Sequence, residues 1–505
     1  MTARACILSA ATMATVTLCS CSAPPSRSAD YRLDPLAFRQ RRAYAEAAGG
    51  RFVSLADFED TPNSHGWDEI NHFSVVGDGS RSFTVNVTAT GSGAMAVLLS
   101  PGADLRFDLP DIRNFTGYAL LSMAVHGSQI RDDLQVTLYG PDGDWTSSRR
   151  LVRPGWNTVM VDLRRAGRDG DLALSDVRAV ALRFTDSADD VRFVLDDVLL
   201  IDNRREISPV PAGMGLWKEG LDYRISLPGR DDEIRLAQNA DGLWRMDDHQ
   251  PVLSLDGGEG ESLEALGARA VGNAELVEHN DIRVRLVSSW YFPDRPGAWA
   301  SMAVRKVVWE HTFYGDGRWV CSTNLDAAGA GQFSGLRIRL PSPAAVAGRG
   351  ISDRIDDPDF TGPAGRWSYL DAPAGEQGRL QEANYLDPQR ITPTRACEDS
   401  YAAGDENRDR FDESQGCFVV SARDGRCRFG IEPNSEPLVR PVFRVIGPWS
   451  EAPMVTAAGM RVKDVTLLKD GSALFVLPGS VRSPMEVEVI GPQREANISP
   501  TKGDP

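Results

Sequence analysis

The sequence predicts an all-β protein made of an N-terminal jelly-roll β-sandwich and a larger antiparallel sandwich. Residues 302–340 carry runs of β-branched and aromatic residues around the turn sequence GDG at 315–317, and they end in the alternating run LRIRL. Short strand-like runs separated by turn residues recur through residues 51–203. Residues 217–495 show no convincing long helical period, which favours sheets there as well.

The N-terminus indicates export. Within residues 1–21, one Arg precedes an uncharged run that is too short for a membrane span, which is the pattern of a signal peptide. Leu18, Cys19, Ser20 and Cys21 resemble a bacterial lipobox, and this resemblance implies a lipidated Cys21 as the first residue of the mature chain. Ordinary cleavage near Ala23 is the alternative. Residues 22–50 are expected to form a polar tether with a short helix at 34–48.

Charge and cysteine content narrow the partners. The net charge of −16 argues against nucleic acid or an anionic membrane surface as a partner. The protein is expected to meet the membrane only through its lipid anchor and to be a monomer. Outside the signal peptide the cysteines are Cys321, Cys397, Cys417 and Cys427. In an oxidising compartment these can form two disulfides in three connectivities. The absence of a CxxC pair disfavours a zinc site.

The first module is predicted from eight strand-like runs, at 52–55, 83–87, 94–99, 119–125, 134–139, 156–163, 177–184 and 191–201. The motifs FED at 58–60, GWNTV at 155–159, VDL at 161–163 and VLDDVLL at 194–200 resemble galactose-binding-like carbohydrate-binding modules. The resemblance extends over residues 51–203. It implies a structural Ca²⁺ ion that joins the first strand to the last, with Glu59 and Asp196 or Asp197 as ligands. Alternatively, these acids are solvated or accept hydrogen bonds from backbone amides.

Sugar binding requires a flat aromatic face bordered by polar groups. In the first module Trp67, Trp145 and Tyr139 are candidates for such a platform, together with His72. Trp156 is assigned to the core, because it begins an apolar strand. For each aromatic side chain, packing inside the sandwich is the alternative.

Residues 204–216, with two prolines and two glycines, predict a linker to the second region. The strand–turn–strand order of residues 304–340 resembles the supersandwich of galactose-mutarotase-like domains and of several polysaccharide lyases and hydrolases. This resemblance implies a β-supersandwich over residues 217–495, followed by a tail at 496–505. Residues 351–415 lack alternation and predict a long loop that walls a cleft, with Trp367 and Tyr369 as sugar-binding candidates.

Linear motifs of esterases, metalloproteases, kinases and dehydrogenases are absent from the sequence. Glycan-cleaving sites need no linear motif: a hydrolase uses two carboxyl groups, and a lyase uses a base together with a cation. The catalytic candidates are Glu310, Tyr314, Arg337, Arg339 and His249. The alternative is a solvated sheet face with ion pairs.

These observations predict an exported, lipid-anchored protein that handles a polysaccharide or oligosaccharide. As an enzyme it would be a lyase or a glycoside hydrolase. A non-catalytic glycan-binding surface lipoprotein is the main alternative, and a structural envelope protein without a ligand is a third.

Overall fold

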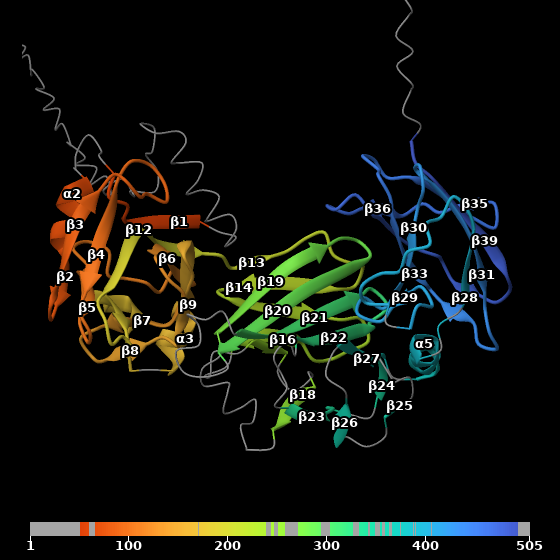
Figure 1. Cartoon of the computed structure of the whole chain (residues 1–505), viewed down its shortest axis with the longest axis horizontal. Helices are drawn as coiled ribbons and strands as arrows, with labels where there is room; N and C mark the ends of the chain where they lie inside the picture. The colour runs from red at the N-terminus through yellow and green to blue at the C-terminus, as the bar shows by residue number, and fades with distance from the viewer. Residues whose placement is uncertain are drawn as a thin grey trace, which may run out of the picture.

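The computed structural model confirms the all-β prediction. It describes residues 51–59, 66–169, 171–238, 244–246, 251–257, 271–293, 304–326, 333–341, 344–348, 354–355, 359–362, 366–373, 375–386, 388, 390–405 and 407–492. The predicted signal peptide with Cys21, the tether, the helix at 34–48 and the tail at 496–505 lie outside these residues. Figure 1 shows a first sandwich (orange), a central group of sheets (green) and a C-terminal sandwich (blue) along the longest axis. None of the helices described could reach across a bilayer.

The first sandwich consists of two six-stranded antiparallel sheets. One sheet contains, in spatial order, β10 (Gly155–Asp162), β6 (Leu120–Gly127), β12 (Val191–Asp202), β4 (Ala94–Leu99) and β3 (Gly79–Thr84), with β1 (Arg51–Ala56) paired to β12. The other contains β2 (Phe73–Val76), β5 (Asp104–Asp108), β11 (Ala179–Phe184), β7 (Arg131–Tyr139) and β8 (Asp144–Thr146), with β9 (Arg150–Val152) paired to β7. The helical turns are α2 (Gly66–Glu69), η1 (Ile70–His72), α3 (Leu163–Asp169) and η2 (Leu174–Asp176). Each of the eight predicted runs overlaps a strand, whereas β2, β5, β8 and β9 were not predicted.

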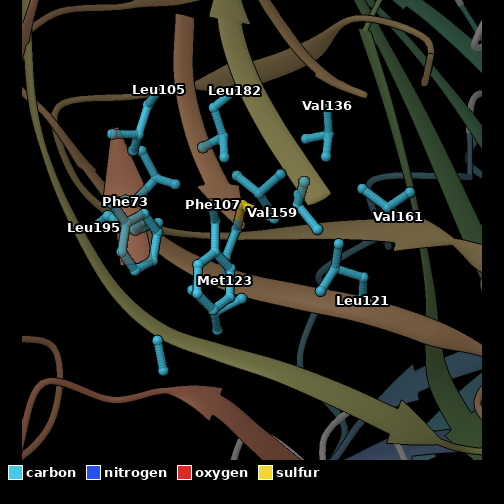
Figure 2. Packing of buried hydrophobic residues seen from close by; sticks show 14 of the residues in the cluster. Phe73, Leu105, Phe107, Leu121, Met123, Val136, Val159, Val161, Leu182 and Leu195 are labelled. Carbon is cyan, nitrogen blue, oxygen red and sulfur yellow. The ribbon is translucent and has the colours of Figure 1, made fainter. Parts of the chain in front are cut away.

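The core of this sandwich fixes which side chains face outward. Figure 2 shows Phe73, Phe107, Met123, Leu182 and their neighbours pointing toward one another between the sheets. The Phe73 and Phe107 rings stack with centroids 4.2 Å apart. Because side chains alternate along a strand, the inward Leu134, Val136 and Leu138 of β7 force the residues between them to the outer surface.

The central group contains three sheets. A five-stranded sheet is formed by β13 (Arg205–Glu206), β14 (Gly215–Glu219), β15 (Asp222–Ser226), β16 (Ile234–Gln238) and β17 (Trp244–Met246). A seven-stranded sheet is formed by β19 (Val271–His279), β20 (Arg283–Pro293), β21 (Val304–Tyr314), β22 (Trp319–Asp326), β27 (Arg366–Asp371), β24 (Ala344–Gly348) and β25 (Arg354–Ile355). The third sheet contains β18 (Val252–Gly257), β23 (Phe333–Arg339) and β26 (Asp359–Gly362). The predicted linker therefore already contains β13, which pairs with β14.

The C-terminal sandwich has two five-stranded sheets. Their members are β28 (Arg390–Arg395), β31 (Arg426–Glu432), β39 (Met485–Ile490), β34 (Met454–Ala457) and β35 (Met460–Arg461) in one, and β29 (Phe411–Asp412), β30 (Cys417–Ser421), β33 (Val442–Ile446), β37 (Ala473–Val476) and β36 (Val465–Leu467) in the other. A two-stranded ribbon joins β32 (Leu438–Val439) and β38 (Ser480–Val481). The pairing of β30 with β33 is parallel, in contrast to the antiparallel arrangement that the sequence predicts.

The seven-stranded sheet connects the central and C-terminal parts. Phe313 and Trp319 point into the central hydrophobic cluster, whereas their strand neighbours Tyr314 and Val320 belong to the C-terminal cluster. Adjacent residues on a strand face opposite ways, so both faces of the sheet are packed at this end. Near Tyr314 neither face of the sheet is therefore open to solvent.

The prediction of a long loop at 351–415 is wrong in part. The segment contains β25, β26, β27 and β28, and also the helix α5 (Glu376–Leu386). The buried residues of α5 are Gly378, Gln381 and Tyr385. Because two of these are small or polar, the helix has no apolar stripe from which its period could be recognised.

Candidate functional site

Glu310 and Tyr314 lie on one face of β21, as the alternation of the strand predicts, but they have separate environments. Glu310 is half-buried and pairs with Arg285, whose Nη2 lies 3.0 Å from Glu310 Oε2. Tyr314 is 2% exposed, and its hydroxyl donates to the backbone carbonyl of Gln415. Burial raises the pKa of Tyr314 to about 12, so the phenol stays protonated near neutral pH. The two residues are four positions apart along the strand, which places their Cα atoms about 13 Å apart.

The structure does not place the remaining catalytic candidates beside Glu310 or Tyr314. Arg339 is exposed on β23, which belongs to the three-stranded sheet, not to the sheet of Glu310. Arg337 lies on the same strand, but its side chain is outside the described part of the structure. His249 is also outside the described residues. Among the candidates that are described, no pair of a carboxylate or base with a cation converges in a cleft.

His311, the neighbour of Glu310, is an interior residue. It is fully buried, and among the described residues neither ring nitrogen has a hydrogen-bond partner. Its ring lies between Trp309 and Trp319, with centroid distances of 6.4 Å and 5.8 Å. Burial lowers the pKa of His311 to about 3, which makes it a neutral core side chain.

The four tryptophan and tyrosine residues Trp67, Trp145, Trp367 and Tyr369 either pack against a core or lack a described side chain. Trp367 and Tyr369 are each 1% exposed and pack in the central hydrophobic cluster, so no sugar ring can reach them. Trp145 is partly buried and packs against the core of the first sandwich. The side chain of Trp67, in α2, lies outside the described residues. Tyr139 is thus the surface aromatic to consider.

Tyr139 lies on the outer face of the sheet formed by β2, β5, β11, β7 and β8, which we call the outer sheet face. It is partly exposed, and across the sheet it aligns with Ala179 of β11, which in turn aligns with Asp108 of β5. One step along, Thr137 aligns with Ala181. Both alanines are buried, at 0% and 4% exposure, beneath the longer side chains of the neighbouring strands.

Charged side chains lie on and beside β11, the central strand of this sheet. Arg183 pairs with Asp104, with Nη2 and Oδ2 2.7 Å apart, and this hydrogen bonding raises the pKa of Arg183. Arg106 donates from Nε to Asp108 at 2.9 Å, while its guanidinium lies 5.0 Å from the centroid of the Tyr139 ring. These contacts hold the guanidinium planes in place, so their remaining N–H groups are oriented before a ligand arrives. The outer sheet face therefore offers an aromatic ring, guanidinium donors and carboxylate acceptors together.

The predicted calcium ligands gather at one corner of the first sandwich. β1 pairs with β12, as expected for a first and last strand, and Glu59, Asp196 and Asp197 are all buried. Glu59 accepts hydrogen bonds from the backbone N–H of Ser92 at 2.9 Å, and Asp196 Oδ2 accepts the N–H of Ala89 at 2.9 Å. Glu59 and Asp196 thus accept hydrogen bonds from backbone amides, which is the alternative to metal binding given above. Within the described residues, no three His, Cys, Asp or Glu side chains are arranged to hold a metal ion.

No protein-family model and no curated protein matches the chain. Similar solved structures include a family 11 carbohydrate-binding module from Clostridium thermocellum in complex with a β-1,3-1,4-mixed-linked tetrasaccharide, at 14% identity and a TM-score of 0.25, covering 30% of this chain and 96% of the module. The CBM22-1 xylan-binding domain of Paenibacillus barcinonensis Xyn10C matches at 15% identity and a TM-score of 0.24, covering 30% of this chain and 97% of the domain. The agarase AgWH50C matches at 14% identity and a TM-score of 0.23, covering 30% of this chain and 26% of the agarase. At such identities and scores, these structures do not assign a ligand to this chain.

Proposed function

We propose that this protein is a glycan-binding surface protein that holds a polysaccharide or oligosaccharide on its outer sheet face. The observation that carries the proposal is the partly exposed Tyr139 ring, bordered by Arg106 and Asp108 beside the alanines of β11. A sugar ring can place its C–H face on the aromatic and guanidinium planes, while its hydroxyls meet carboxylates and N–H groups. Binding is favoured over cleavage, because Glu310 is ion-paired and Tyr314 is buried and protonated.

The test is binding to a panel of neutral and acidic polysaccharides, measured by affinity electrophoresis and calorimetry. We expect Tyr139→Ala to weaken retention by about tenfold without changing the melting temperature, because the ring lies at the surface. Tyr401→Ala is a matched control, since Tyr401 is 43% exposed and has an arginine, Arg410, 4.8 Å above its ring, but lies in the C-terminal part. No retention on any glycan, or equal losses in both variants, would count against the outer sheet face as a binding site.

We further propose that the chain is exported and anchored through a lipidated Cys21, which places the sandwich at the cell envelope. The support is the uncharged run of residues 5–19 followed by the lipobox-like residues 18–21. The mature protein should then partition into a detergent phase, whereas Cys21→Ser should not. An unmodified N-terminus near Ala23 would instead indicate ordinary cleavage.

We propose Ca²⁺ as a stabiliser of the first sandwich. Glu59, Asp196 and Asp197 supply buried negative charge beside one loop, although the ion would have to replace the hydrogen bonds to that loop. At a free calcium concentration about 100 times the dissociation constant, unfolding should require about 2.7 kcal/mol more than in chelator. Calorimetric melting with Ca²⁺ and with EDTA measures this difference, and Asp196→Asn should remove it. Identical melting curves under both conditions would mean that these carboxylates are stabilised by hydrogen bonds from backbone amides and not by Ca²⁺.

A further inference from the structure

A cleft lies where the first sandwich meets the central five-stranded sheet. Its volume is about 460 Å³, within the range of small-ligand sites in proteins. Figure 1 shows β13 and β14 next to β1 and β6, which is the junction that contains the cleft. The first sandwich contributes an apolar wall that includes Leu120 and Met160, and the side chain of Leu221 continues it. Clefts between structural units are frequent binding sites, because each unit supplies one wall.

The opposite wall includes apolar side chains such as Ile207, Trp244 and Leu276, and it carries two cations. Lys218 lies on β14 with its Nζ 3.7 Å from the centroid of the Tyr223 ring, and Nζ donates to the carbonyl of Leu221 at 2.9 Å. Arg205, on β13, is exposed and aligns with Lys218 across the sheet. In the described part of the chain, neither side chain takes part in a salt bridge. Both cations therefore keep N–H donors for a ligand.

Two acidic groups near Lys218 form salt bridges with arginines. Asp162 and Asp222 both pair with Arg164, and Asp222 also pairs with Arg235. Glu275 of β19 lines the cleft. Among the lining residues, Lys218 and Arg205 are cations and Glu275 carries the carboxylate, so the lining has one positive charge in excess when Lys218 is protonated. A monoanion with some apolar surface matches this balance better than a neutral ligand or a dianion.

We propose that this cleft binds a carboxylate-bearing ligand, namely a uronic acid residue, with the carboxylate between Lys218 and Arg205 and the ring against Met160 and Leu221. The choice of a sugar acid as the ligand rests on the glycan-binding function proposed above. It adds a second site, remote from Tyr139, and an acidic class of ligand. The same cleft would also accept a free small carboxylic acid, and the experiment separates these two sources.

The protonation state of Lys218 gives the site a pH dependence. Burial lowers the pKa of Lys218 to about 7, with Arg164 and Arg205 acting in the same direction and Asp222 and Asp162 opposing it. Tyr223 and Glu275 are the other ionisable groups at this wall, and burial raises the pKa of Tyr223 to about 12. A bound carboxylate favours the ammonium form. Binding should therefore take up a proton near neutral pH, and affinity should fall as the pH rises above about 7.

The experiment titrates the full-length mature protein with trimers of galacturonic, glucuronic and mannuronic acid, and with the neutral trimers made from them by carboxyl reduction. We expect at least one acidic trimer to bind about tenfold or more tightly than its neutral counterpart. Lys218→Met, which keeps the aliphatic stem, and Arg205→Gln should each remove about tenfold of that preference. Lys463→Met, at an exposed lysine, is the control and should change nothing. The free uronic acid is titrated in parallel, and Lys218-dependent binding as tight as that of the trimer would make a free acid the ligand of the same site.

Two results would overturn the proposal while leaving the proposed function intact. One is equal affinity for acidic and neutral trimers, and the other is acidic binding that Tyr139→Ala abolishes but Lys218→Met does not. If Lys218→Met fails to fold, acetylation of the wild-type protein with acetic anhydride at about pH 7 provides a second measurement. Lys218 should react before the exposed Lys463 and Lys469, and the acidic trimer should protect it. Equal acetylation of Lys218 with and without trimer would also overturn the proposal.

Discussion

Replacing Glu278 with Gln should lower the free energy of unfolding by about 3–5 kcal/mol. Glu278 holds Arg283, which is fully buried at the start of β20, through Nε to Oε1 at 2.8 Å and Nη2 to Oε2 at 3.1 Å. The guanidinium also donates to Gln415 Oε1 at 3.1 Å, in the segment just before β30. The ion pair therefore lies where the seven-stranded sheet meets the C-terminal sandwich. Without the carboxylate, a buried cation would remain uncompensated at this junction.

Urea unfolding of the wild type and of Glu278→Gln measures the effect. Glu310→Gln is the matched control: Glu310 pairs with Arg285 in the same sheet at 3.0 Å, but both side chains keep contact with solvent, and the cost should be about 1 kcal/mol or less. A loss for Glu278→Gln no larger than that of the control would show that Arg283 finds other partners.

The same pair predicts an acid sensitivity. Burial disfavours the charge on Glu278, but Arg283 and Arg285 outweigh it and hold the pKa of Glu278 below its ordinary value. A carboxyl whose pKa is lower in the folded state contributes stability above its unfolded pKa of about 4.3, and this contribution is lost as the pH falls through the folded value. Between pH 7 and this acidic range, the wild type should lose stability that Glu278→Gln has already lost.

The sequence predicts the first sandwich well because its strands alternate and its core residues are aliphatic. Runs such as 94–99 and 134–139 coincide with β4 and most of β7. The missed strands β2, β8 and β9 have four residues or fewer, which leaves no period to detect. The missed helix α5 buries Gly378 and Gln381, residues that carry no hydrophobic signal. Local pattern is therefore sufficient for strands with one apolar face and insufficient for elements that tertiary contacts stabilise.

The candidate sites were harder to predict, because burial decides what an aromatic or ionisable residue does. Trp367 and Tyr139 have equally plausible local sequences, yet one is 1% exposed in a core and the other lies partly exposed on a sheet. Nothing in the local sequence marks Lys218 as a candidate binding residue. Its proposed role depends on the cleft that it forms with Leu120 and Met160, which come from another part of the fold. The junction that forms the cleft is a long-range property, and no local period encodes it.

Cysteine pairing also depends on contacts that the local sequence does not encode. Of the four cysteines, the structure brings Cys397 and Cys427 together. Cys397 Sγ lies 3.0 Å from Cys427 Sγ, whereas Cys321 and Cys417 are fully buried in different hydrophobic clusters. The hydrogen bond from Cys427 lowers the pKa of Cys397 to about 7, and Cys397 is partly exposed. Its thiolate can attack a disulfide-bonded oxidant, and Cys427 then displaces the reduced thiol to leave one intramolecular disulfide.

We expect protein recovered from an oxidising compartment to contain the Cys397–Cys427 disulfide and two free thiols. Because the bond closes the segment between residues 397 and 427, it should stabilise the folded state by about 3–4 kcal/mol relative to the reduced protein. Peptide mapping without reductant identifies the pair, and urea unfolding with and without dithiothreitol measures the stabilisation. In the Cys397→Ser, Cys427→Ser double variant the reductant should have no effect, because Cys321 and Cys417 are inaccessible until the chain unfolds. A disulfide that includes Cys321 or Cys417 would contradict this arrangement, since either thiol would have to leave a packed core to form it.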